Sequence, residues 1–399
     1  MLNVENIRGL VDMYGPSFYY FNAEALAEHY CLWKSAFSSV YPHVQLAYSY
    51  KTNYLPFLCN QVRLLGGLAE VVSNAEYQIA NKIGVPNSNI IFNGPMKSVD
   101  LSTSIILSGG IVNVDSYSEA KELIGAIRKE STDRQKIGIR CNFKLSENES
   151  RFGIPVASSE FNKVLQLFRE NDIQVGCLHC HMKGRSLETW HIKAETMLDI
   201  FDSVIEHCSP DCCINLGGGV PALIDCANPR ATAEQYAEAI AGVFRENFDH
   251  GGPTLILEPG TALAAPSMAF ITTAIAKKVI NERCFVTLAA SCHNLGSTQN
   301  RNPRYLAQIP MGVQNSNTVL CGYTCLEDDL ICEYTKSVNI GDILVFKNVG
   351  AYSLVMKPPF IMPNFPILSN NNQTGEYAVL RKAEDISAFC TEEELACEQ

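Results

Sequence analysis

Short apolar runs alternate with longer segments of helical pattern between about residues 40 and 265, and this alternation constrains the fold most strongly. The runs are nearly continuous in apolar residues, which is typical of strands buried on both faces of a parallel sheet. The predicted strands are 44–50, 68–73, 90–93, 111–115, 136–142, 174–181, 212–216 and 254–257. Eight strand–helix units of this length predict a closed (β/α)8 TIM barrel of the alanine racemase type.

An open doubly wound sheet is the alternative fold. That fold is usually marked by a Gly-x-Gly-x-x-Gly turn after its first strand, where a helix begins. No such turn follows Lys51. The barrel is therefore the preferred prediction.

The pattern changes after Pro266, where short strand-like runs are separated by turn residues. A chain of 399 residues is also longer than the roughly 250–300 residues at which single cores stop growing. We therefore expect two domains. The barrel is predicted for residues 24–265, and residues 1–23 together with 266–399 are predicted to form a β-rich barrel or sandwich.

Charge and cysteine content narrow the functional classes. The net charge of -11 argues against nucleic acid or an anionic membrane as a main partner, since both repel an acidic surface. No signal-peptide pattern opens the sequence, so its sixteen cysteines predict a reduced, cytoplasmic protein. The spacing of Cys177, Cys180 and His181 resembles a haem-attachment motif, but the cluster lies in an apolar strand-like run, so we expect neither haem nor zinc.

Polar residues recur where the predicted barrel strands end. Each one alone has a simpler explanation as a loop, core or turn residue. Together they would meet at one rim, because active sites of such barrels lie at the carboxyl ends of the strands. The residues in question are Lys51, Glu70, Arg140, His181, Gly217, Gly218, Gly219, Glu258 and Gly260.

This set suits pyridoxal phosphate. A lysine in an apolar setting can form a Schiff base with a carbonyl group. Consecutive glycines offer backbone N–H donors to an anion such as a phosphate. A carboxylate such as Glu258 can hold a proton on a pyridine nitrogen, which makes the ring a better electron sink.

With these residues in place, the chain resembles the fold-type III pyridoxal-phosphate decarboxylases, which include the ornithine, arginine and diaminopimelate decarboxylases. Nine short motifs occur in the order of that family and span most of the chain. They are YSYKTN (48–53), AEVVSNAE (69–76), NVDS (113–116), SRFGI (150–154), LHCHMKG (178–184), NLGGG (215–219), EPG (258–260), CGYTCLEDD (321–329) and GDILVFKNVGAYS (341–353).

The resemblance implies roles for individual residues. Lys51 would carry the cofactor as a Schiff base, His181 would stack on its ring, and Glu258 would pair with its ring nitrogen. Cys325 would protonate the substrate carbon after carbon dioxide leaves. Residues expected around the cofactor or its phosphate are Glu70, Arg140, Gly218, Gly219, Gly260 and Tyr352. The family builds its active site at a dimer interface, to which Cys325 and Tyr352 contribute, so a homodimer with shared active sites is expected.

The sequence departs from the family at several positions. Thr261 stands where the family has an arginine that binds phosphate, and we hypothesise that Lys183 or Arg185 replaces this cation. Leu326 stands where related enzymes hold an acidic residue for a distal amine, so a basic diamine precursor is disfavoured as substrate. Arg301 and Arg304 are candidates to bind a distal carboxylate.

Three functions remain open on the sequence. The preferred one is a decarboxylase that removes the α-carboxylate of an amino acid or of a biosynthetic intermediate derived from one. A racemase or epimerase on the same fold is disfavoured by Glu258, because alanine racemases have an arginine there. A non-catalytic relative is disfavoured by the presence of both Lys51 and Cys325.

Overall fold

The computed structural model describes residues 4–131, 134–145, 150–222, 231–248, 251–296, 306–309, 314–370 and 377–395. The chain divides into two compact units. The first, here the barrel unit, is Ala27–Leu263, and the second, the β-rich unit, combines Met1–Leu26 with Ala264–Gln399. Arg301 and Arg304 lie outside the described residues.

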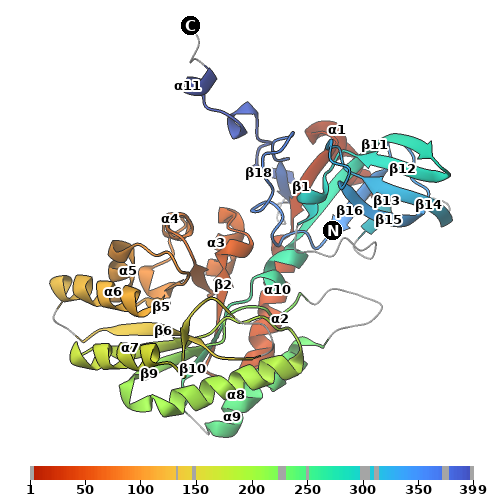
Figure 1. The fold of residues 1–399 in the computed structure, drawn as a ribbon. Coiled ribbons are helices and arrows are strands. Elements are labelled where there is room, and N and C mark those ends of the chain that lie inside the picture. The colour runs from red at the N-terminus through yellow and green to blue at the C-terminus, as the bar shows by residue number, and fades with distance from the viewer. Residues whose placement is uncertain are drawn as a thin grey trace. The chain divides into compact units, whose positions relative to one another are not determined.

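Eight parallel strands in the described part of the barrel unit form a closed barrel, as predicted (Figure 1). Each strand pairs in parallel with the next, and the last pairs with the first, so that no edge remains between them. The short strand β7 (Ile154–Pro155) pairs with the end of β6. The barrel strands are β2 (Val44–Ser49), β3 (Leu68–Val71), β4 (Ile90–Phe92), β5 (Ile111–Val114), β6 (Lys136–Asn142), β8 (Gln174–His179), β9 (Cys208–Asn215) and β10 (Thr254–Leu257).

Several strands end earlier than predicted: β2 by one residue, and β3 and β8 by two residues each. Lys51 follows β2 in a short 3-10 turn, Tyr50–Thr52, and His181 follows the end of β8 at His179. Strand β9 also begins earlier than predicted, at Cys208.

Helices alternate with the barrel strands and cover their outer face (Figure 1). Many begin at a serine or threonine whose hydroxyl accepts the N–H three residues on, as at Ser73, Ser116 and Thr232. The helices are α2 (Ala23–Val40), α3 (Pro56–Leu64), α4 (Asn74–Lys82), α5 (Val99–Leu107), α6 (Tyr117–Glu130), α7 (Ser159–Glu170), α8 (Leu187–Ser203) and α9 (Ala233–Asn247).

Small apolar side chains fill the barrel interior. Ala47, Ile91, Cys177, Cys213 and Ile256 form one buried cluster there. Cys177 therefore packs as a small hydrophobic residue. None of the helices in the described ranges is long and apolar enough to cross a membrane.

The β-rich unit is a largely antiparallel sheet, as predicted for the region after Pro266. Strand β1 pairs with β11, which brings the N-terminal segment into this unit. Helix α1 (Val4–Tyr14) packs its Ile7 and Leu10 into the core of the unit. The short helix α10 (Thr261–Ala264) spans the boundary between the two units. The other elements of the β-rich unit are β1 (Ser17–Phe21), β11 (Met268–Ile280), β12 (Arg283–Leu288), β13 (Leu306–Ile309), β14 (Gln314–Cys321), β15 (Leu330–Lys336), β16 (Ile343–Lys347), β17 (Ile367–Asn370), β18 (Tyr377–Arg381) and α11 (Glu392–Leu395).

Candidate active site

Lys51 lies at the carboxyl end of β2 and meets a carboxylate from the neighbouring strand. The register of β2 and β3 sets Ser49 beside Glu70. The Lys51 Nζ donates to Glu70 Oε2 at 2.5 Å and to Ser49 Oγ at 2.6 Å. Glu70 is buried, whereas the Lys51 side chain is 31% exposed, and the two hydrogen bonds orient the amine.

A chain of asparagine amides links Glu70 to Glu258 across the barrel. Asn93 Nδ2 donates to Glu70 Oε1 at 3.1 Å and to Glu258 Oε1 at 2.8 Å. Asn113 Nδ2 donates to Asn93 Oδ1, and Asn215 Nδ2 donates to Glu258 Oε1, both at 2.8 Å. The sequence analysis did not single out these asparagines, although all three lie within predicted strands, where a buried amide needs partners.

Glu258 follows β10 and is 1% exposed. Burial alone raises the pKa of this carboxyl, but the rings of His179 and His181 and the Lys51 ammonium more than offset it, so the pKa lies well below its usual range. Within the described residues Oε2 accepts no hydrogen bond, although it is buried. An ionised oxygen of this kind needs a donor, and the described residues donate no hydrogen bond to it.

His181 stands against the glycine loop that follows β9. Its Nδ1 accepts a hydrogen bond from the Gly218 N–H at 3.1 Å and lies 3.8 Å from Glu258 Oε2. A Cβ atom at Gly218 would lie 2.6 Å from the Glu258 carbonyl oxygen, and one at Gly260 would lie 2.0 Å from Thr52 Oγ1. Both positions therefore require glycine.

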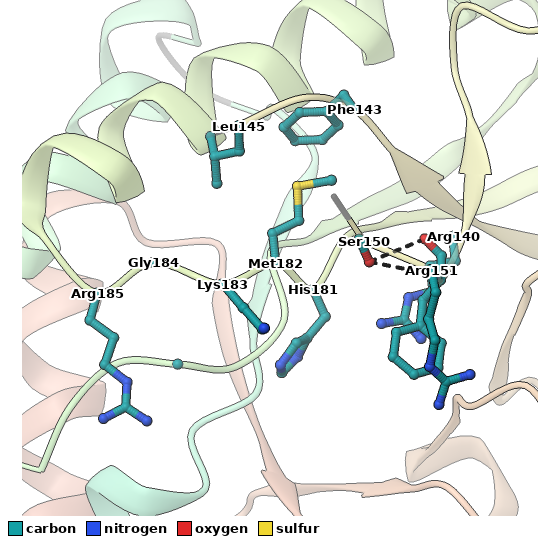
Figure 2. A pocket seen from close by; sticks show the side chains of 12 residues that line it. Arg140, Phe143, Leu145, Ser150, Arg151, His181, Met182, Lys183, Gly184 and Arg185 are labelled. Atoms are coloured by element: carbon teal, nitrogen blue, oxygen red, sulfur yellow. Dashed lines mark hydrogen bonds between the residues drawn. The ribbon is translucent and has the colours of Figure 1, made fainter. Parts of the chain in front are cut away.

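A cavity of about 620 Å³ opens beside His181 and carries several cationic side chains (Figure 2). Arg140 lies 3.4 Å from Asp115 and 4.7 Å from the ring centre of Phe152, over which the Arg151 guanidinium also packs at 3.9 Å. Apolar residues complete the wall. The lining residues include Arg140, Phe143, Leu145, Arg151, Phe152, His181, Met182, Lys183, Arg185 and Gly219.

The remaining site candidates belong to the β-rich unit. Cys325 and Leu326 are exposed on the loop between β14 and β15, and Tyr352 has a positive φ of 54°. Asp329 holds this loop, because it accepts hydrogen bonds from Thr324 Oγ1 at 2.7 Å and from the Cys292 N–H at 2.8 Å. Asp329 was missed by the sequence analysis as a supporting residue.

The residues of the barrel unit fit pyridoxal phosphate. Lys51 offers an amine for a carbonyl group, and Glu258 Oε2 is a buried acceptor that a protonated ring nitrogen would satisfy. Gly219 lines the cavity without a side chain, and the neighbouring Gly218 also leaves its backbone uncovered, as an anion site requires.

Comparison with known proteins supports the same chemistry. Residues 24–265 match the family model of the pyridoxal-dependent decarboxylases, pyridoxal binding domain. The chain is 26% identical to diaminopimelate decarboxylase of Methanocaldococcus jannaschii over 93% of this chain and 89% of that protein. It is 22% identical to the L-glutamyl-[BtrI acyl-carrier protein] decarboxylase of Niallia circulans, over 97% and 96% of the two chains.

The crystal structure of M. jannaschii diaminopimelate decarboxylase in complex with L-lysine superposes with a TM-score of 0.85 at 21% identity, covering 97% of this chain and 95% of that one. It has the same fold. These relatives favour decarboxylation over the racemase and the non-catalytic alternatives. The chain therefore belongs to the pyridoxal-dependent decarboxylase family, as an enzyme that uses pyridoxal phosphate to remove a carboxylate from an amino-acid type of substrate.

Proposed function

We propose that Lys51 is the residue that holds pyridoxal phosphate and that Glu258 is the partner of its ring nitrogen. One observation carries this assignment. The Lys51 amine and the Glu258 carboxylate belong to a single buried network, joined through Glu70 and Asn93. The two groups that the cofactor needs at its opposite ends are thus positioned by the same hydrogen bonds.

The other residues take supporting roles. Bound pyridoxal phosphate supplies an electron sink for the carbon that loses its carboxylate. Ser49 and Glu70 orient the Lys51 amine, and His181 provides a flat face beside the ring. The proposed set around the cofactor and its phosphate also contains Arg140, Gly218, Gly219, Gly260 and Tyr352.

We assign Cys325 as the group that returns a proton to the substrate carbon, in a homodimer with shared active sites. An exposed thiol on a loop fixed by Asp329 suits a group that works against a second subunit. The domain boundaries at 24 and 265 remain a prediction. The cytoplasmic location is proposed on the cysteine content of the sequence alone.

The substrate we propose is an α-amino acid, or a conjugate of one, whose distal end is anionic or neutral. Arg151, Lys183 and Arg185 line the cavity beside His181 and favour a negative group. The exposed Leu326 offers no charge for a distal ammonium. The test is carbon dioxide release from diaminopimelate, glutamate, a glutamyl thioester, lysine and ornithine. Faster release from lysine or ornithine than from the other three would contradict this specificity.

Lys51 is tested with the holoenzyme and borohydride. Reduction of the wild type is expected to yield pyridoxyl-lysine at residue 51 in a peptide map. Lys51→Ala is expected to lose this adduct and all measurable turnover, whereas the exposed Lys136→Ala serves as the control and retains both. An adduct on another lysine, or a wild-type protein that stays colourless with pyridoxal phosphate, would overturn the assignment.

The shared site is tested by mixing inactive variants. If Lys51 and Cys325 of one site come from different chains, reassociated mixtures of Lys51→Ala and Cys325→Ala contain native sites. Random pairing then restores roughly a quarter of wild-type activity. No recovery from a mixture that has demonstrably exchanged subunits would refute the shared site.

A further inference from the structure

A lysine with no role in the proposed mechanism is buried behind the glycine loop. Lys193 lies on α8 with an exposed fraction of 0%, and it is among the largest fully buried side chains of the chain. A buried lysine is unusual, because removing an ammonium group from water is costly unless a partner compensates it. None of the ion pairs in the described ranges includes Lys193.

Two contacts tie the Lys193 amine to the loop Gly217–Gly219. Its Nζ lies 3.4 Å from the carbonyl oxygen of Leu216, the residue that precedes the loop, and donates to it. It also lies 3.1 Å from the ring centre of Trp190, one helical turn away on α8. The ammonium is therefore held by a carbonyl and by the face of an indole ring.

Trp190 also lies next to the loop, at Gly219. A Cβ atom at Gly219 would lie 3.7 Å from Trp190 Cζ2, which is ordinary van der Waals contact. The Trp190 Nε1 is buried and makes no hydrogen bond within the described residues. Lys193 and Trp190 thus form one support behind the loop, and this support carries a charge.

The titratable groups that act on Lys193 are Cys180, beyond β8, and Glu258, beyond β10. Burial lowers the pKa of Lys193 to about 8, and these two groups oppose that shift. The amine is therefore mostly charged at neutral pH and loses its charge in mildly alkaline solution. Neither Cys180 nor Glu258 is a cation, so neither group repels the Lys193 ammonium.

We infer that Lys193 is a positioning residue that fixes the glycine loop and supplies a buried positive charge behind it, so that the loop binds the phosphate of the cofactor. This inference rests on the proposed function of the loop. Thr261 lacks the charge that an arginine would give there, and an ammonium behind the loop strengthens the pull of its N–H groups on an anion.

The test compares pyridoxal phosphate with pyridoxal, which lacks the phosphate. Affinities of the apoprotein for both are measured by absorbance titration for the wild type, Lys193→Met and the control Met197→Leu, a buried change on the same helix. Lys193→Met is expected to weaken pyridoxal phosphate about tenfold and to leave pyridoxal unchanged. In the wild type, the ratio of the affinity for pyridoxal phosphate to that for pyridoxal is expected to fall as the pH rises through about 8. In Lys193→Met this ratio is expected to show no such fall.

Stability of the apoprotein separates this role from a merely structural one. A buried ammonium without a counter-ion opposes folding, so the melting temperature of Lys193→Met apoprotein is expected to equal or exceed that of the wild type. An equal loss of affinity for both ligands, or unchanged affinity for both, would overturn the inference while leaving the Lys51 adduct intact. Failure of the wild type to bind pyridoxal phosphate would instead refute the proposed function itself.

Discussion

Two buried carboxylates, Glu76 in the barrel unit and Asp329 in the β-rich unit, are held in different ways. Glu76 Oε2 accepts a hydrogen bond from the Val72 N–H at 2.8 Å, and burial raises the pKa of Glu76 to about 7. Burial also acts on Asp329, but hydrogen bonds from Cys292 and Thr324 more than offset it and lower its pKa. The number of donors, rather than burial, therefore decides which carboxylate keeps its charge.

Nearby side chains act in addition on Glu258 in the barrel unit. Glu258 accepts two amide hydrogen bonds at Oε1, and the rings of His179 and His181 together with the Lys51 ammonium hold its pKa well below the usual range despite burial. In the β-rich unit the charge of Asp329 has a supporting task, because it orders the loop that carries the exposed Cys325. Glu258 thus belongs to the proposed cofactor site of the barrel unit, whereas Asp329 supports a loop of the β-rich unit.

The largest effect is expected for Glu258→Gln, which removes the ionised group from the barrel unit. A neutral amide cannot stabilise a protonated ring nitrogen, so turnover should fall about a thousandfold. The exposed Glu238→Gln is the matched control and should be unaffected. Steady-state turnover of holoenzymes with equal cofactor content measures this. A loss below tenfold would mean that Glu258 is not the partner of the ring.

Cys325→Ala tests the β-rich unit and should lower turnover about a hundredfold, the usual contribution of a proton donor. Because Cys325 is proposed to return a proton and not to bind the cofactor, cofactor absorbance and affinity should remain those of the wild type. Cys31→Ala, another exposed thiol, is the control. A variant that also loses the cofactor would show that the β-rich unit residue Cys325 contributes to cofactor binding, contrary to this prediction.

Lys183→Ala and Arg185→Ala test whether either cation substitutes for the arginine missing at Thr261. Both side chains line the cavity beside His181, on the two sides of Gly184 (Figure 2). The one that contacts the phosphate should weaken pyridoxal phosphate about tenfold at low ionic strength. Unchanged affinity in both variants would show that neither side chain replaces the missing arginine.

Glu76→Gln should make the barrel unit more stable at alkaline pH. A carboxyl whose folded pKa is raised destabilises the fold increasingly as the pH climbs from about 4.5 through about 7. The variant should therefore gain up to about 3 kcal/mol over the wild type at pH 8 and nothing at pH 4. Urea unfolding at both pH values measures the difference, and a gain that is equal at both would contradict a titrating Glu76.

Asp329→Asn should have the opposite pH dependence and should lower the free energy of unfolding by about 2 kcal/mol at neutral pH. Because the pKa of Asp329 is lowered in the folded state, its carboxylate stabilises the fold at pH values above the unfolded pKa of 3.8. This stabilisation is lost as the pH falls through the folded pKa, which lies below 3.8. The difference in the free energy of unfolding between variant and wild type should therefore become smaller at acidic pH. A gap that stays constant to low pH would show that the charge of Asp329 is not what stabilises the loop.

Several features were predictable because they follow from local chemistry. The alternation of apolar runs and helical segments predicted the barrel, and the short strand-like runs after Pro266 predicted the second sheet. Lys51, His181 and Glu258 were predicted at one rim because the ends of parallel strands meet there. The structure links Lys51 to Glu258 through Glu70 and Asn93 and places His181 Nδ1 3.8 Å from Glu258 Oε2. The errors of one residue at the end of β2 and of two residues at the end of β8 did not disturb this, since the rim includes the turns.

The amino-acid sequence by itself determined the order of strands and helices and the kinds of chemical group at the barrel mouth. Only the tertiary structure decided which groups meet, because partners such as Asn93 and Glu258 lie far apart in the chain and depend on barrel closure. Lys193 is the sharpest case. Its place one turn after Trp190 marks a helix face, but whether that face buries an ammonium or exposes it is set by packing against the glycine loop.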